Sequence, residues 1–360
     1  MKRFFVSDCE GPISKNDNAF ELTARFVPEG DKLFSLISKY DDFLADVVKK
    51  KGYVAGSTLK MILPFLKAYD VTDSLMKEFS AGNLILISGI HNTLKHVRSI
   101  TEAFIVSTSY EHYIKALCDV LAFPFENTYC TRLSMENFSL STEEKNYLKK
   151  TAKEIASMPN INIPSSATSL SDLAMRDQRT VQRLDEIFWT EIARMGCGKK
   201  IYKVNTIGGE QKAKAIRDAA KKLCAPLSNV MYVGDSITDV EAFQLVRKRG
   251  GLTVAFNGNN YAVRNADVAV LAEHSIVTAI LADVFVKDGK ERALQLASNW
   301  NLEHLRGSMV DSSLLDCLVE LYPKALPKVQ IVTAENMESL VKESSMFRNK
   351  VRGEAIGKLG

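Results

Sequence analysis

The sequence predicts an α/β fold, a doubly wound parallel sheet with helical cap inserts at the ends of its strands. Short apolar runs, rich in β-branched and aromatic residues, each end in small or acidic residues. These runs are unbroken rather than alternating, which is typical of strands buried on both faces. Stretches with helical periodicity lie between or after them, as the crossovers of a parallel sheet require. The predicted strands are Arg3–Ser7, Ala103–Ser107, Lys200–Val204, Val230–Val233, Leu252–Phe256 and Asp267–Leu271.

The spacing of these runs predicts the domain organisation. A core is expected from residues 1–13, 100–130 and 200–285, with helices at Glu111–Phe123, Gln211–Leu223, Asp239–Lys248 and Ser275–Val284. Residues 14–99 are expected to form a helical cap, and residues 131–199 a second helical insert. Residues 286–360 are expected to form a C-terminal helical extension, whose basic end from Arg348 to Lys358 reads as a frayed tail.

Composition and charge exclude several classes of protein. The chain of 360 residues is 46% hydrophobic and 25% charged, values of a globular protein rather than a disordered or fibrous one. A net charge of +4 without a concentrated basic run predicts no nucleic-acid partner. No apolar stretch reaches the length of a membrane span, and Asp8 and Glu10 interrupt the N-terminus before a signal sequence could develop. We therefore expect a cytoplasmic protein without membrane insertion.

Two carboxylates follow the first predicted strand. Asp8 and Glu10 stand at positions i and i+2, so both side chains leave an extended backbone on the same side and can face one pocket. Gly11 and Pro12 then allow the chain to turn away. Taken alone, the motif is equally consistent with an acidic turn on the surface.

Polar side chains also follow two other strands. Ser107 and Thr108 end the second strand at the start of a helix, where hydroxyls and free amides bind anions or simply cap the helix. Asp235 and Asp239 follow the fourth strand one helical turn apart and could hold a divalent cation. Lys212, which alone reads as a solvated surface lysine, begins the helix before that strand. Together the set predicts phosphoryl transfer through an aspartyl phosphate.

These motifs resemble those of the haloacid dehalogenase (HAD) superfamily, and within it the phosphoserine-phosphatase-like enzymes. Asp8-Cys9-Glu10-Gly11 resembles the first motif, Asp-x-Asp-Gly, and Ser107-Thr108-Ser109 the second. Lys212 is similar to the lysine of the third motif, and Gly234-Asp235-Ser236-x-x-Asp239 to the fourth, Gly-Asp-x-x-x-Asp. The resemblance covers the core segments and implies an HAD-like Rossmannoid fold.

The resemblance also implies a role for each matching residue. Asp8 would be the nucleophile and would bind Mg²⁺ through its other carboxylate oxygen. Glu10 would bind the metal through its backbone carbonyl and serve as general acid and then base. Ser107 and Thr108 would bind the phosphoryl oxygens, Lys212 would offset their charge, and Asp235 would complete the metal site, with Asp239 as a direct or indirect metal partner.

Glu10 departs from the family pattern, which usually has Asp at this position. The backbone carbonyl is unaffected, but the extra methylene moves the carboxyl group by about 1 Å, and misplacement on that scale can cost about a hundredfold in rate. Pro12 is a smaller departure, because the family usually has Thr or a similar residue there.

Two functions follow from the resemblance. One is a Mg²⁺-dependent phosphatase acting on a small phosphorylated metabolite, with the helical inserts closing over the site; transfer to an acceptor other than water would use the same residues. The alternative follows from Ser7-Asp8-Cys9-Glu10-Gly11-Pro12-Ile13-Ser14, which also resembles archaeal HAD-like proteins of methanogens, some named energy-converting hydrogenase A subunit R. That name implies an accessory subunit with a protein-complex partner and little or no turnover.

Overall fold

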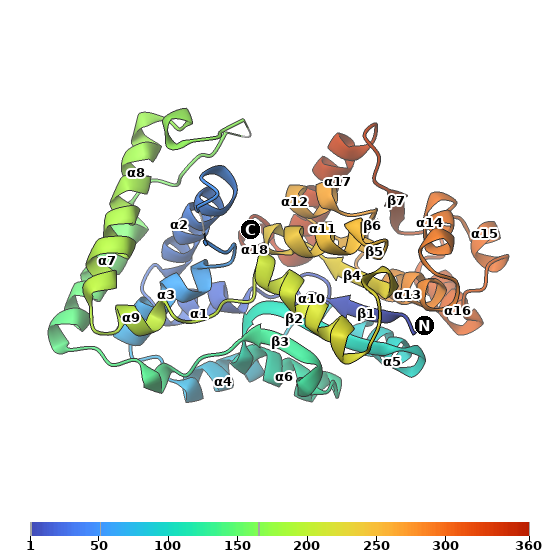
Figure 1. Cartoon of the computed structure of the whole chain (residues 1–360), viewed down its shortest axis with the longest axis horizontal. Helices are drawn as coiled ribbons and strands as arrows, with labels where there is room; N and C mark the ends of the chain where they lie inside the picture. The colour runs from blue at the N-terminus through green and yellow to red at the C-terminus, as the bar shows by residue number, and fades with distance from the viewer. Residues whose placement is uncertain (1, 51, 165, 360) are drawn as a thin grey trace.

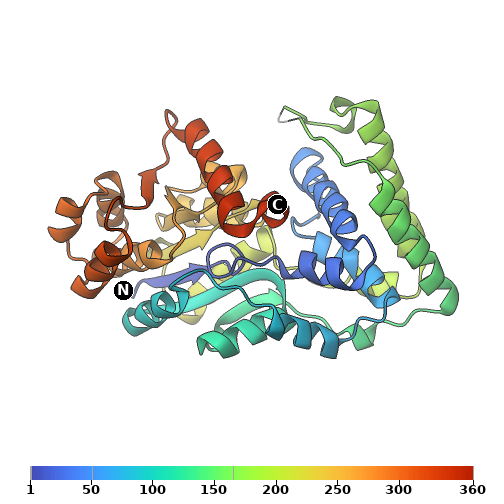
Figure 2. The ribbon, with the colours of Figure 1, turned by 180° about the vertical axis from the view of Figure 1, so that it is seen from behind.

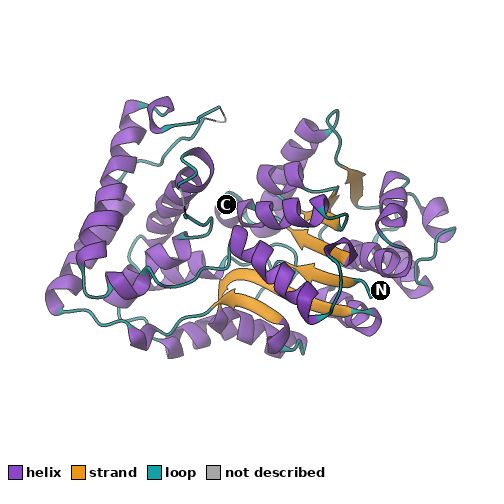
Figure 3. Ribbon diagram, in the orientation of Figure 1, coloured by secondary structure: helices purple, strands orange, loops and turns teal. Residues whose placement is uncertain are grey.

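A seven-stranded sheet forms the centre of the computed structural model, which describes residues 2–50, 52–164 and 166–359. The strands are β1 (Phe4–Ser7), β2 (Glu102–Tyr110), β3 (Thr128–Thr131), β4 (Val230–Gly234), β5 (Leu252–Phe256), β6 (Val268–Leu271) and β7 (Lys328–Ile331). Their order is β3-β2-β1-β4-β5-β6-β7, and β7 alone runs antiparallel to its neighbour (Figure 3). After β1 the chain forms β2 and β3 on one side of β1, and it then returns to form β4 on the other side. A ligand-binding crevice is therefore expected at the carboxyl ends of β1 and β4.

Helices cover both faces of the sheet because alternate residues of each strand face opposite layers. Phe4 and Val6 of β1 pack against one helical layer, whereas Phe5 packs against the other. The first layer consists of α10 (Glu210–Lys222), α11 (Val240–Lys248), α12 (Asn260–Asn265) and α17 (Met337–Arg352). The second consists of α5 (Ile90–Ile100), α6 (Glu111–Leu121), α13 (Ile276–Asp288), α14 (Lys290–Ser298), α15 (Leu302–Arg306) and α16 (Ser312–Leu321).

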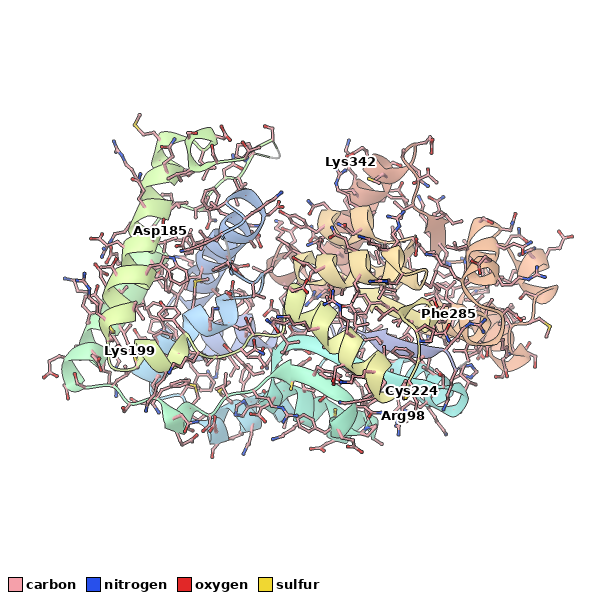
Figure 4. All side chains as sticks on the ribbon, viewed as in Figure 1. Arg98, Asp185, Lys199, Cys224, Phe285 and Lys342 are labelled. Atoms are coloured by element: carbon pink, nitrogen blue, oxygen red, sulfur yellow. The ribbon has the colours of Figure 1, made fainter. Side chains whose placement is uncertain are left out.

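The two inserts share one apolar core beside the carboxyl ends of the strands (Figures 1 and 2). It is built from α1 (Asn18–Phe26), α2 (Gly30–Asp42), α3 (Thr58–Ala68), α7 (Thr142–Ser157), α8 (Met175–Glu186) and α9 (Gly198–Ile201). Tyr40 of α2 donates a hydrogen bond to Asp185 of α8 and accepts one of 2.7 Å from Trp189. Asp185 is labelled in Figure 4, as is Lys199 on α9. We refer to these helices together as the cap.

Part of the first insert belongs to the sheet layers instead. α4 (Asp73–Gly82) packs against α6, and α5 packs against α13. The predicted division into a core, a cap at 14–99, a second insert at 131–199 and an extension from 286 remains a prediction. No helix in the described part of the chain is long and apolar enough to cross a membrane.

Three local predictions are wrong. Lys200–Val204 is not a strand: Ile201 is the last residue of α9 and is buried in the cap, where a short apolar run serves a helix as well as a strand. The extension is not purely helical, because β7 pairs with β6 at the sheet edge. Arg348 to Lys358 is not a frayed tail, since α17 continues to Arg352 and α18 (Glu354–Gly357) follows it.

A buried ion pair ties the extension to the sheet and yields a stability prediction. Asp267 Oδ2 accepts hydrogen bonds from Thr253 N (3.1 Å) and Lys290 Nζ (2.8 Å). Asp267→Ala leaves the buried N–H of Thr253 without this acceptor and removes the carboxylate partner of Lys290, which keeps its bond to Gly251 O. The substitution should lower the free energy of unfolding by about 2 kcal/mol in urea denaturation. The exposed Asp316→Ala on α16 is the matched control and should change it by less than about 0.5 kcal/mol. Equal effects of the two variants would contradict this account.

Candidate active site

The carboxyl ends of β1, β2 and β4 bring the predicted residues together. Asp8 follows β1, Ser107 lies in β2 and Asp235 follows β4, and β1 pairs with both other strands. The carboxylates of Asp8, Asp235 and Asp239 each offer an oxygen atom, and these atoms lie within 4.8 Å of one another. Residues far apart in sequence therefore form one buried polar cluster at the topological switch point of the sheet.

Lys212 is the centre of this cluster. Its side chain is fully buried, and Nζ lies 2.7 Å from both Asp8 Oδ2 and Asp239 Oδ1. Burial alone would lower the pKa of Lys212, but the charges of Asp239 and Asp8 outweigh it and raise the pKa above its ordinary value. The lysine is thus held as a cation in direct contact with the predicted nucleophile.

Asp239 has its carboxylate oxygens satisfied by the protein. Oδ1 accepts hydrogen bonds from Lys212 Nζ (2.7 Å) and Tyr232 Oη (2.6 Å). Oδ2 accepts from the backbone N–H groups of Asp235 (2.9 Å) and Ser236 (3.0 Å). These contacts fix the lysine and the turn that carries Asp235, which favours the indirect role among the two that the sequence left open.

Asp8 is buried at the end of β1, and both its backbone and its side chain form hydrogen bonds. Its N–H donates to Val233 O (2.8 Å), and its Oδ1 accepts from Cys9 N (2.7 Å). Burial raises the pKa of Asp8 to about 7, with Lys212 opposing the shift and Asp239 and Asp235 adding to it. A carboxylate in so dry an environment is poorly solvated, which suits attack on an electrophile.

Glu10 lies at the start of the cap. Its Oε1 accepts a hydrogen bond of 2.8 Å from the N–H of Asn18, the first residue of α1. Burial and the nearby Asp17 carboxyl raise the pKa of Glu10 well above its ordinary value. These surroundings favour the protonated form of Glu10, which is the form that a general acid uses.

Gly11 allows the first loop to approach the second carboxylate. Its φ of +107° lies in the region that favours glycine, and a Cβ there would stand 2.1 Å from Asp235 Oδ2. The glycine is thus required both by its backbone conformation and by the close packing of this loop against Asp235.

Ser107 and Thr108, near the carboxyl end of β2, line the same cavity, which has a volume of about 90 Å³ and is bounded by Asp8, Glu10 and Asp235. Ser107 Oγ donates to Ser109 Oγ (3.1 Å) and accepts from Ser109 N (3.2 Å). Thr108 Oγ1 donates to Ile207 O (3.1 Å), so its proton is already used. The cap closes the cavity from the other side through Phe34, Ser38, Asp41, Gly56, Thr58 and Leu59.

Sequence reasoning missed Arg348 and Arg352, which reach the site from α17. Nη1 of each guanidinium contacts Oδ2 of Asp235, at 3.0 Å for Arg352. Their four-residue spacing on a helical pattern would have placed them on one helix face. Nothing in the sequence placed that face over the loops that follow β1 and β4.

The donor set fits a divalent cation such as Mg²⁺. Asp8 and Asp235 supply hard carboxylate oxygens that lie close together in a buried site, as such ions require. Arg348 and Arg352 contact one of these carboxylates, so a cation binding there has to compete with two guanidinium groups.

Comparison with known proteins places the chain in a family. A sequence model described as haloacid dehalogenase-like hydrolase matches residues 52–283, more than half of the chain. The match includes Ser107, Lys212, Asp235 and Asp239, and it begins after Asp8. No sequence among curated proteins matches the chain.

Of two solved structures, the first shares the fold of the chain over nearly its whole length. A gene product from Archaeoglobus fulgidus is 24% identical with a TM-score of 0.78, over 100% of this chain and 99% of that one. Apo phosphoserine phosphatase is 13% identical with a TM-score of 0.42, over 76% of this chain and 96% of that one. The family match confirms the predicted HAD resemblance and the expectation of an HAD-type hydrolase, and the sheet confirms the α/β fold class. The chain belongs to the family of haloacid dehalogenase-like hydrolases.

Proposed function

We propose that the protein is a Mg²⁺-dependent phosphatase that hydrolyses a small phosphorylated metabolite through a phosphorylated Asp8. The observation that carries this proposal is the convergence of Asp8 and Asp235 on one cavity that residues of the first insert also line, with Lys212 in contact with Asp8. The size of the cavity, about 90 Å³, favours a small substrate. The location of the protein in the cytoplasm remains a prediction.

In the first step an oxygen of the Asp8 carboxylate attacks phosphorus. A new O–P bond forms, the ester O–P bond of the substrate breaks, and Glu10 gives its proton to the departing oxygen. Lys212 offsets negative charge beside Asp8, and the hydroxyl of Ser107, which lines the cavity, turns from Ser109 Oγ to the phosphoryl oxygens. The products of this step are the alcohol and the phosphorylated Asp8.

In the second step water hydrolyses the acyl phosphate. Glu10, now ionised, takes a proton from the water while the water oxygen attacks phosphorus, and the bond between phosphorus and the Asp8 oxygen breaks. Inorganic phosphate leaves, and the carboxylate of Asp8 and the proton on Glu10 are restored. Asp8 and Asp235 would hold Mg²⁺, which supplies charge stabilisation to the phosphoryl oxygens when bound.

A second candidate function is an HAD-fold accessory subunit of an energy-converting hydrogenase complex, with little or no turnover. Two observations favour it: Arg348 and Arg352 engage Asp235, and Glu10 both replaces the usual Asp and caps α1. Against it stands the buried lysine between two carboxylates, an arrangement whose desolvation is costly and that a subunit without turnover has no need of.

Replacing the nucleophile separates the two candidates. Asp8→Asn removes the attacking carboxylate and should abolish Mg²⁺-dependent phosphate release from a panel of phosphorylated metabolites and a generic aryl phosphate. The exposed Asp31→Asn in the cap serves as the control and should keep wild-type rates. Turnover in Asp8→Asn equal to wild type would exclude this mechanism, and no wild-type turnover on any substrate would favour the accessory subunit.

Replacing Glu10 tests its role as acid and base. Glu10→Gln keeps an oxygen that can accept from Asn18 N–H but carries no transferable proton. We expect an alkyl phosphate to be cleaved about 10²- to 10⁴-fold more slowly. An aryl phosphate needs no proton on its leaving group, so it should give a rapid burst of one equivalent of phenol before slow release of phosphate. Equal slowing of both substrates in the first step, measured by quenched flow, would refute the acid role.

A further inference from the structure

Two arginines of the C-terminal extension lie inside the candidate active site. Arg348 and Arg352 stand one turn apart on α17, and both line the cavity that contains Asp8. Figure 2 shows the C-terminal helices lying against the loops that follow β1, although more than 330 residues separate Arg352 from Lys15 and Asn16.

Both guanidinium groups are buried and oriented by the protein. The side chains are 3% and 4% exposed. Arg352 Nε donates to Lys15 O (3.0 Å), and Nη2 donates to Asn16 O. Arg348 Nε donates to Gly357 O (3.1 Å). These backbone contacts leave Nη1 of each arginine directed at Asp235 Oδ2, next to Asp8.

A charge count shows what the arginines balance. With the carboxylates ionised, Asp8, Asp235 and Asp239 carry three negative charges against three positive charges on Lys212, Arg348 and Arg352. These six groups balance one another without any metal, and four further carboxyl groups line the same cavity: Glu10, Asp17, Asp41 and Asp42. A divalent cation on Asp8 and Asp235 adds two positive charges beside the arginines, which favours an anion there.

We propose that Arg348 and Arg352 form an anion-binding pair for the phosphoryl oxygens of the substrate, and that a divalent cation on Asp235 makes the pair available. A phosphoryl dianion offsets the charge that the cation adds, and guanidinium groups bind phosphate oxygens strongly and with defined geometry. This inference rests on the proposed function and adds to it residues outside the predicted motifs. It makes phosphate binding dependent on the cation.

Phosphate binding to the full-length protein tests the inference without turnover. Isothermal titration calorimetry with inorganic phosphate should give at least tenfold tighter binding in the presence of Mg²⁺ than without it. Arg352→Met should lose at least tenfold in phosphate affinity with Mg²⁺ present. Lys350→Met on the same helix removes a charge paired with Glu273 at the surface and should bind phosphate like the wild type.

A second titration shows that the variant site is intact. Mg²⁺ should bind Arg352→Met at least as tightly as the wild type, because one competitor for Asp235 is gone. If Arg352→Met bound both Mg²⁺ and phosphate like the wild type, Arg352 would only hold α17 against the loop after β1, and the inference would be overturned. Equal phosphate affinity of the wild type with and without Mg²⁺ would overturn it independently of any variant. Neither result depends on whether Asp8 is phosphorylated, so failure here is distinct from failure of the proposed function.

Discussion

The contact of the buried Lys212 with Asp8 and Asp239 is the constraint on which the site depends. A fully buried ammonium group requires compensating charge, and both carboxylates approach it to 2.7 Å. Asp8 comes from the end of β1, and Asp239 from the turn after β4. The lysine therefore requires these two strand ends to lie beside each other, which the pairing of β1 with β4 provides.

The extremes of the chain complete the site around this contact. The loop after β1 packs against Asp235 through Gly11, and α17 adds two guanidinium groups to the same carboxylate. The cap covers the opening and is itself tied to the first loop, because Glu10 accepts from the first residue of α1. Movement of the cap would therefore be coupled to the position of the proposed general acid.

The sequence was sufficient where function depends on strand ends. Asp8, Ser107 and Asp235 could be placed together because parallel strands present their carboxyl ends at one edge of a sheet. The sequence was insufficient where tertiary packing decides whether a segment forms a strand or a helix, or whether a charged side chain is buried. The run from Lys200 to Val204 has the composition of a strand, yet Ile201 fills the cap core from a helix. The sequence pattern placed Arg348 in a frayed tail, because only the docking of α17 over the loops reveals Asp235, the partner that makes burial of the arginine tolerable.

The central claim is that Asp8 carries the phosphoryl group during turnover. Its most direct test is chemical trapping: the enzyme is mixed with Mg²⁺ and an aryl phosphate, quenched during turnover, and treated with borohydride, which reduces an acyl phosphate to an alcohol. Peptide mass spectrometry should then find Asp8 converted to homoserine in a substrate-dependent manner. Turnover with unmodified Asp8, or trapping at another carboxylate, would contradict the account.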